Sequence, residues 1–161
     1  MKIAIIFHSQ TGQTLRLAKL MESKLTKAGH EVALTQLQTD VPVKEGSIRQ
    51  PMNFEITNLP DVSGFDVILA GGPVWGFGPS TVIYKAITKL ENLKGKKFLA
   101  FVTMGFPLTG LGGKATVKQM SKAAAVNGAI ILPGIMVPKM FRNFELLLEK
   151  GAEDCVKYIS L

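Results

Sequence analysis

Cysteine and histidine are scarce in this chain of 161 residues, which contains one Cys and two His. A single cysteine excludes an intramolecular disulfide and any multi-cysteine zinc or iron–sulfur site. The two histidines, His8 and His30, leave little material for a metal centre. We therefore expect no bound metal, and a fold that is stabilised by its hydrophobic core.

Long apolar runs are also missing from the sequence. No run approaches the ~20 residues of a membrane span. The N-terminal stretch 1–7 is too short for the apolar core of a signal peptide and lacks a cleavage site. Together with the lone cysteine, these absences predict a cytoplasmic protein that has no membrane partner.

Acidic residues are outnumbered, because 19 Lys and Arg face 12 Asp and Glu, giving a net charge of +7. No acid occurs between Glu91 and Glu145, a stretch that contains seven lysines and Arg142. A basic balance raises the question of nucleic acid. These basic residues are dispersed, however, and no arginine-rich or aromatic-plus-basic RNA motif accompanies them. We therefore expect no nucleic-acid partner.

Short apolar runs alternate with segments of helical periodicity along the chain. The pattern predicts strands at 3–7, 31–37, 65–70, 97–103 and 129–137, and helices at 13–28, 80–90, 113–127 and 143–160. Residues 39–63 contain three prolines and no sustained period, which predicts an irregular connection with a short extended piece at 54–56. A connection of this length usually indicates function or mobility.

This alternation predicts one α/β domain over residues 1–161, a doubly wound three-layer sandwich. The expected core is a five-stranded parallel sheet in the order 2-1-3-4-5. In such sheets ligands bind beyond the carboxyl ends of the strands, at the switch between strands 1 and 3. The loops expected there are 8–14, 71–80 and 103–113, where Gly, Ser and Thr are concentrated.

The first of these loops has the composition of a phosphate site. It reads Ser9-Gln10-Thr11-Gly12-Gln13-Thr14 and leads directly into a predicted helix. A helix N-terminus offers unpaired N–H groups and the positive end of a dipole, and three hydroxyls would add donors. Ordinary N-capping is the alternative interpretation. Neither the GxxxxGK[ST] nor the GxGxxG phosphate motif follows the first strand.

The second loop reads Gly71-Gly72-Pro73-Val74-Trp75-Gly76-Phe77-Gly78-Pro79-Ser80 and contains the only tryptophan of the chain. The face of Trp75 is a good stacking surface for a flat heteroaromatic ring. Gly76 can turn its peptide either way, so its carbonyl could meet a ring N–H that appears on reduction. Alternatively, Trp75 and Phe77 close the end of the sheet as part of the core.

These two loops resemble those of the flavodoxin family. Ser9 to Thr14 matches every defined position of the phosphate motif [ST]-x-T-G-x-T, and Gly72 to Trp75 resembles the second flavin loop. The resemblance implies non-covalent FMN, with its phosphate on Ser9, Gln10, Thr11, Gly12, Gln13 and Thr14. It implies that the flavin ring lies against Trp75 and Gly76. The other cofactor-binding residues that we expect are Pro73, Val74, Phe77, Gly78, Thr103, Met104, Gly105, Phe106, Gly110 and Gly113. Many flavodoxins have a tyrosine in the third loop, and Phe106 is its nearest substitute here.

Three functions are compatible with this resemblance. The first is a flavodoxin-type electron carrier between redox partners. The second is an FMN-dependent NAD(P)H oxidoreductase that reduces quinones or similar small acceptors. The third is a flavin-responsive sensor or partner-binding module. Flavodoxin carriers are usually strongly acidic, so the basic charge of this chain weakens the carrier hypothesis and favours an anionic partner or a phosphorylated donor.

The remaining candidate residues are weighed between structure and function. Lys114, Lys118 and Lys122 recur every four residues, either as a solvated helix face or as a docking strip for an anionic partner. His8, at the end of its strand, could contact the phosphate, but we expect it to make a local hydrogen bond instead. Cys155 lies at a core spacing in the last helix and is expected to be a small hydrophobe rather than a nucleophile.

Overall fold

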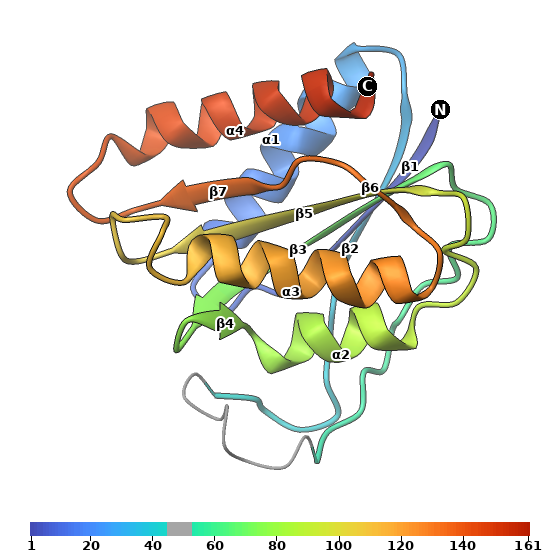
Figure 1. The fold of residues 1–161 in the computed structure, drawn as a ribbon, viewed down its shortest axis with the longest axis horizontal. Coiled ribbons are helices and arrows are strands. Elements are labelled where there is room, and N and C mark those ends of the chain that lie inside the picture. Colours follow the sequence, from blue (N-terminus) through green and yellow to red (C-terminus); the bar gives the residue numbers. More distant parts are fainter. Residues whose placement is uncertain (45–52) are drawn as a thin grey trace.

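The computed structural model describes residues 1–44 and 53–161, and Figure 1 shows their arrangement. The strands are β1 (Lys2–Phe7), β2 (Glu31–Gln36), β3 (Val67–Trp75), β4 (Gly78–Pro79), β5 (Lys97–Met104), β6 (Ile130–Ile131) and β7 (Ile135–Pro138). The helices are α1 (Gln13–Lys27), α2 (Thr81–Lys89), α3 (Gly113–Val126) and α4 (Phe144–Ile159). All four predicted helices are therefore present, with ends that differ by one residue at most.

A parallel sheet forms the centre of the molecule. Its order is β2-β1-β3-β5, with β6 and β7 both beside the far edge of β5. In β1, Ile5 lies opposite Leu34 of β2 on one side and Leu69 of β3 on the other. The predicted order 2-1-3-4-5 and the three-layer α/β class are confirmed, with β6 and β7 together supplying the fifth strand.

The helices cover the two faces of this sheet in pairs (Figure 1). Helices α1 and α4 pack on one face, and α2 and α3 pack on the other. Side chains of a strand point alternately to the two faces. In β1, accordingly, Ile5 joins the core under α1 and α4, whereas Ile6 joins the core under α2 and α3. Both faces are apolar, as the continuous apolar run of this strand predicts.

Two strands differ from the sequence-based prediction. The third strand was expected to end at Ala70, but β3 continues to Trp75 and turns back as β4. Pro79 therefore lies in β4, and α2 begins only after its N-cap Ser80. The fifth strand is divided into β6 and β7, because Pro133 has no N–H to donate to the ladder.

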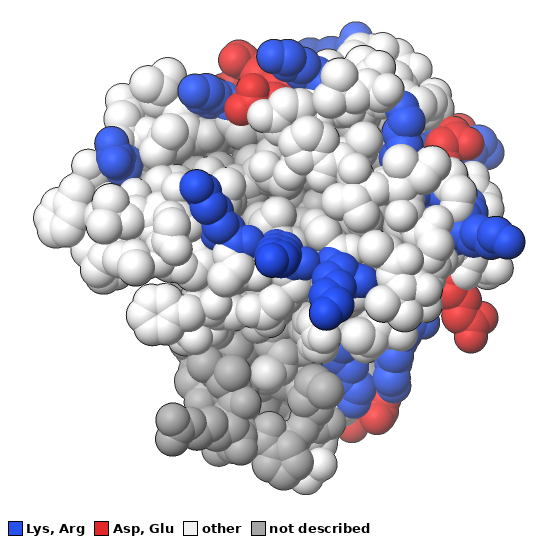
Figure 2. Space-filling view, in the orientation of Figure 1, with Lys and Arg blue, Asp and Glu red and all other residues white. Residues whose placement is uncertain are grey.

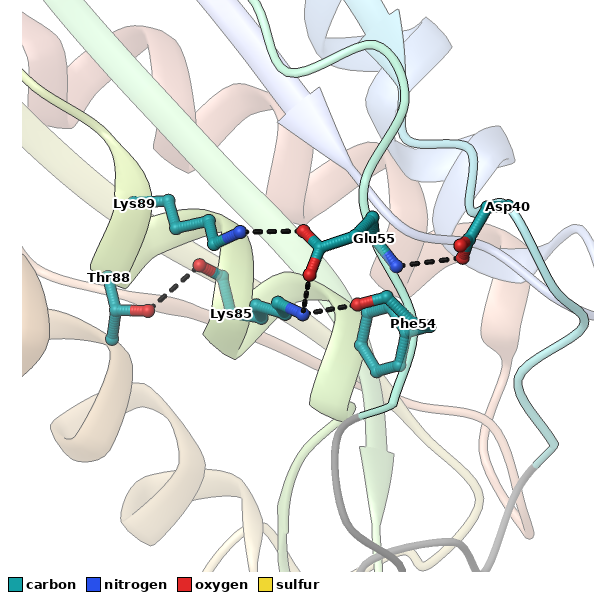
Figure 3. Close-up of polar contacts among 6 residues, drawn as sticks. All are labelled: Asp40, Phe54, Glu55, Lys85, Thr88 and Lys89. Carbon is teal, nitrogen blue, oxygen red and sulfur yellow. Dashed lines mark hydrogen bonds and ion pairs between the residues drawn. The ribbon is translucent and has the colours of Figure 1, made fainter.

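The long connection between β2 and β3 is attached to α2 in its described part. Thr39 and Ile56 form an isolated antiparallel bridge, which is the only strand pairing of the predicted extended piece 54–56 within the described residues. Figure 3 shows the attachment: the buried Lys85 donates to the carbonyl of Phe54 and lies 3.2 Å from Oε1 of Glu55. Lys89 approaches the other carboxylate oxygen of Glu55 at 2.7 Å. Residues 45–52 of the predicted connection lie outside the described part.

The helices of the described residues are all too short or too polar to span a bilayer.

Candidate functional site: a pocket at the carboxyl edge of the sheet

The carboxyl ends of β1, β3 and β5 and the segments that follow them meet at one edge of the sheet, although most of the predicted second loop, 71–80, lies in β3 and β4. They enclose a pocket of about 240 Å³. Its lining consists of Gln10, Thr11, Gln13, Thr14, Pro73, Val74, Trp75, Thr103, Met104, Gly105, Lys139 and Phe144. The polar groups belong mainly to the first loop, so one end of the pocket is rich in hydrogen-bond donors.

The N-terminus of α1 forms that polar end. Its N-cap is Gly12, with φ of 87°, a left-handed conformation that favours glycine. Gly12 has no side chain with which to cap the helix, and among the described residues only Oγ of Ser9 accepts from a first-turn N–H, that of Leu15 at 3.3 Å. By contrast, Ser80 caps α2 and Asn143 caps α4. The first N–H groups of α1 lack partners within the helix, as at any helix start, and suit an anion.

Two threonine side chains lie at the base of the pocket. Oγ1 of Thr14 is 2.8 Å from Oγ1 of Thr103, and the two residues are 2% and 5% exposed. Each hydroxyl has one proton. One proton bridges the pair, so the other is free to be donated to a group in the pocket. The pair thus connects the first and third loops and supplies one donor.

Trp75 lies differently from the expectation that it forms part of an open loop. It is the last residue of β3 and is only 2% exposed. The imidazole of His8 packs edge-on against the indole, with ring centroids 5.3 Å apart and an interplanar angle of 87°. The alternative that Trp75 closes the end of the sheet is therefore the one that this conformation favours, although the residue still lines the pocket.

His8 has the local hydrogen bond that its position at the end of β1 predicts. Its Nδ1 is 2.9 Å from Oγ of Ser80, the N-cap of α2. Burial lowers the pKa of His8 to about 4, because the charged imidazolium would lose its hydration there. The ring is therefore neutral at physiological pH, so it adds no positive charge to the pocket.

The tip of the β3–β4 hairpin provides an exposed aromatic residue instead. Gly76 and Phe77 both have positive φ, 51° and 70°, as in a two-residue type I′ turn. Such a conformation is unfavourable for a bulky side chain such as Phe77, and backbone strain of this kind is concentrated at functional sites. The ring of Phe77 is not held by the core, since the residue is 67% exposed.

A shallow hollow of about 150 Å³ adjoins the pocket at this tip. It is lined by Val74, Gly76, Phe77, Met104, Gly105, Phe106 and Leu111. Val74, Met104 and Gly105 line both cavities, so the two adjoin. Phe106, the substitute for the family tyrosine, is 52% exposed at its rim. The site therefore has a polar end for an anion and an apolar, aromatic end for a flat ring.

Thirteen of the predicted site residues line one of these two cavities. The five that line neither are Ser9, Gly12, Gly78, Gly110 and Gly113. Ser9 accepts a hydrogen bond from the N–H of Leu15 at 3.3 Å and so stabilises the first loop from behind. Gly78 pairs with Trp75 in the hairpin, and Gly113 begins α3.

Three lining residues were missed in the sequence analysis: Leu111, Lys139 and Phe144. Leu111 lies in a loop that was predicted to form the site, but it carries no polar group. Lys139 directly follows β7, and its N–H donates to the carbonyl of Met104 at 2.9 Å. Its position just beyond a strand's carboxyl end was a usable signal. Phe144 enters because α4 starts beside the pocket.

The basic strip, defined as Lys114, Lys118 and Lys122, lies on α3 next to the site. All three side chains are exposed. Figure 2 shows a row of basic side chains across the face that α3 occupies in Figure 1, with no acidic side chain among them. Met120 and Ala124, on the opposite side of the helix, are buried against the sheet. This agrees with the predicted orientation of α3.

The fold, with a pocket at the carboxyl edge of its parallel sheet, is that of a flavodoxin-like protein. The family model of NADPH-dependent FMN reductases matches residues 1–141. The chain belongs to this family.

Known relatives agree with that assignment. The chain is 27% identical over 147 residues to an NAD(P)H dehydrogenase (quinone) of Archaeoglobus fulgidus, covering 81% of this chain and 75% of that protein. Among solved structures it is similar to oxidised flavodoxin 2 of Bacillus cereus, with a TM-score of 0.72, 19% identity and 99% of each chain covered. It is also similar to two-electron reduced flavodoxin of Megasphaera elsdenii, with a TM-score of 0.62, 25% identity, and 94% and 98% of the chains covered.

Proposed function

We propose that the flavin is FMN and that the donor-rich pocket holds its phosphate. The single observation that carries this proposal is that the N-terminus of α1, whose N-cap is Gly12, opens into a pocket with the hydroxyls of Thr11 and Thr14. A phosphate monoester accepts hydrogen bonds from N–H and O–H groups, so these neutral donors suit it. The adjoining hollow then takes the flavin ring, with Phe77 and Phe106 as its aromatic neighbours.

The bound flavin would supply the transfer of hydride and of single electrons, and the protein would supply binding, orientation and electrostatics. Gln10, Thr11 and Gln13 would hold and orient the phosphate end. Gly76 lies at the rim with its peptide exposed, so its carbonyl can accept a hydrogen bond from a ring N–H. The apolar residues Val74 and Met104 line both cavities and would lie between the phosphate and the ring.

The proposed electron donor is NAD(P)H, which would reduce the flavin directly. The family and the A. fulgidus relative support a nicotinamide donor. The charge of the site supports it too, because the basic strip on α3 starts beside the ring hollow and would attract the phosphates of a dinucleotide. The hollow is shallow and its two phenylalanines are exposed, which leaves room for a nicotinamide to approach.

A second candidate function is electron transfer to an anionic protein partner. It is favoured by exposed apolar side chains around the same edge, where Leu108, Met140 and Phe141 are 53%, 46% and 87% exposed. Exposed aromatic and aliphatic groups beside basic ones are typical of surfaces that bind other proteins. In this case the protein would be a carrier that is reduced by another enzyme.

Anaerobic mixing of the FMN-loaded protein with NADPH or NADH, without any partner, separates these candidates. If NAD(P)H reduces the flavin directly, the absorbance of the oxidised flavin at roughly 450 nm should disappear. The loss should occur within the turnover time of a typical enzyme, on the order of seconds. If the flavin stays oxidised with both nucleotides, the oxidoreductase hypothesis is contradicted and the electron-carrier hypothesis remains. Free FMN with the same nucleotides is the control.

The basic strip has its own test. Lys114→Glu with Lys118→Glu should slow the reaction with the donor or partner and should leave FMN affinity unchanged. In the unmodified protein, the rate should fall as salt is added, because charges are screened beyond ~8 Å at physiological ionic strength. If the rate changes neither with salt nor in the Lys114→Glu, Lys118→Glu variant, the basic strip is only a solvated helix face.

A further inference from the structure

Lys139 differs from every other residue that lines the polar pocket. It is the one lysine or arginine among the described lining residues, and it comes from outside the three predicted loops. Its backbone is held in place, since its N–H donates to Met104 at 2.9 Å and the N–H of Met140 donates to Gly105 at 3.0 Å. The stem of the side chain is thus fixed to the third loop, whereas the side chain itself is exposed.

The ammonium group of Lys139 is available for a ligand. Within residues 1–44 and 53–161 it makes no hydrogen bond or ion pair with the protein. The nearest acid along the chain, Glu145, is paired with Arg16, and the guanidinium of Arg16 also lies 5.6 Å from the ring centroid of Phe144. The charge of Glu145 is therefore already balanced, and Lys139 faces a pocket whose other polar lining groups are neutral.

We propose that Lys139 is the cation that neutralises the terminal phosphate of the flavin and makes this pocket selective for a phosphate monoester. This inference rests on the proposed FMN function and deepens it. The donors of α1 and its loop would orient the phosphate, but a dianion surrounded only by neutral donors keeps its full charge. A lysine contributed by the β7–α4 loop would add a positive charge to these donors, and a hydrogen bond to a charged group is stronger than one between neutral groups.

The test compares FMN, riboflavin and inorganic phosphate on the flavin-free full-length protein. Lys139→Gln should weaken FMN binding roughly 10-fold, the lower end of the range for a hydrogen bond to a charged group, because the side chain is exposed. Riboflavin affinity should not change. Inorganic phosphate should compete with FMN in the unmodified protein and compete less well in the variant. The salt dependence of FMN binding should also become shallower, since one charge pair is lost.

Two matched variants make the comparison specific. Lys139→Arg keeps the positive charge and should retain most of the preference for FMN over riboflavin. Lys118→Gln removes a lysine of the basic strip that does not line the pocket, and it should leave both flavin affinities unchanged. Thermal unfolding of each flavin-free variant should match the unmodified protein, because both lysines are exposed.

Each outcome has a distinct meaning. In one outcome the unmodified protein prefers FMN to riboflavin and the Lys139→Gln variant keeps the same ratio of FMN affinity to riboflavin affinity. That outcome overturns the role of Lys139 and leaves the FMN proposal standing. Equal losses of FMN and riboflavin in that variant also overturn it, because they would indicate a change in pocket shape. An unmodified protein that binds both flavins equally overturns the FMN proposal, and the inference about Lys139 with it.

Discussion

The pair of Thr14 and Thr103 makes opposite predictions for folding and for flavin binding. In the flavin-free protein the two buried hydroxyls satisfy each other across 2.8 Å. Thr14→Val or Thr103→Val leaves one buried hydroxyl without its partner, which should lower the free energy of unfolding by about 1–3 kcal/mol. Replacing both removes the two polar groups together. The double variant should therefore lose less free energy of unfolding than the two single variants lose when their losses are added.

Flavin binding should follow the number of protons that the pair can offer. The intact pair has two hydroxyl protons, one of which is used within the pair, so one remains for the phosphate. A single variant has one hydroxyl, whose proton is free, and it should therefore bind FMN with little loss. The double variant has none and should lose about 1–3 kcal/mol of FMN binding, the scale of a hydrogen bond to a charged group.

Urea unfolding and calorimetric FMN titration of the four proteins test both halves of this argument. The expected coupling in unfolding is about 1–3 kcal/mol, well above the ~0.5 kcal/mol within which independent sites add. Strict additivity in unfolding would refute the pairing of the hydroxyls. Equal FMN affinity in the double variant and the unmodified protein would refute their role as a phosphate donor.

Four further properties can be predicted from burial, backbone conformation and charge. Trp75→Ala should lower the free energy of unfolding by about 3–5 kcal/mol because the indole is buried. Phe77→Asn should change stability by less than about 1 kcal/mol and weaken flavin binding, since Asn tolerates positive φ; equal stability losses would contradict this contrast. The free energy of unfolding should decrease by up to roughly 3 kcal/mol as the pH falls from about 6.5 to about 4. The cause is that burial lowers the pKa of His8 in the folded protein, so the unfolded chain takes up the proton at a higher pH. His8→Asn should flatten that window, and an unchanged slope would show that another group causes it. Burial raises the pKa of Cys155 to about 12, so a thiol reagent should label it only after denaturation; rapid labelling of the native protein would contradict its burial.

The fold could be predicted because its signals are local. Strand β1 is a continuous apolar run, and each helix repeats its apolar residues with a helical period. The end of β3 could not be predicted, because Gly71, Gly72 and Pro73 are typical of a turn. In the structure these residues pair with Phe101, Val102 and Thr103 of β5. A pairing between segments about 30 residues apart thus outweighs weak local strand propensity.

Some parts of the candidate site could likewise be predicted from local sequence, and other parts could not. The phosphate loop could be recognised because its donors are contiguous from Ser9 to Thr14. Trp75 packs against His8, which is far away in the sequence, so the local composition indicates an open loop where the structure has a strand end. Lys139 reaches the pocket only because β7 pairs with β5, bringing Pro138 beside Met104. Its role could not be inferred from any single motif.

Titration of the isotopically labelled, flavin-free protein with FMN, followed by amide NMR shifts, tests the central claim most directly. The account predicts the largest shifts at Thr11–Thr14, in the hairpin tip at Gly76 and Phe77, and at Gly105. Another hollow, of about 760 Å³, is lined by Leu90, Asn92 and Lys94 among others. None of the residues with large expected shifts lines it. Shifts centred on that hollow, with the amides of the phosphate loop unmoved, would contradict the account.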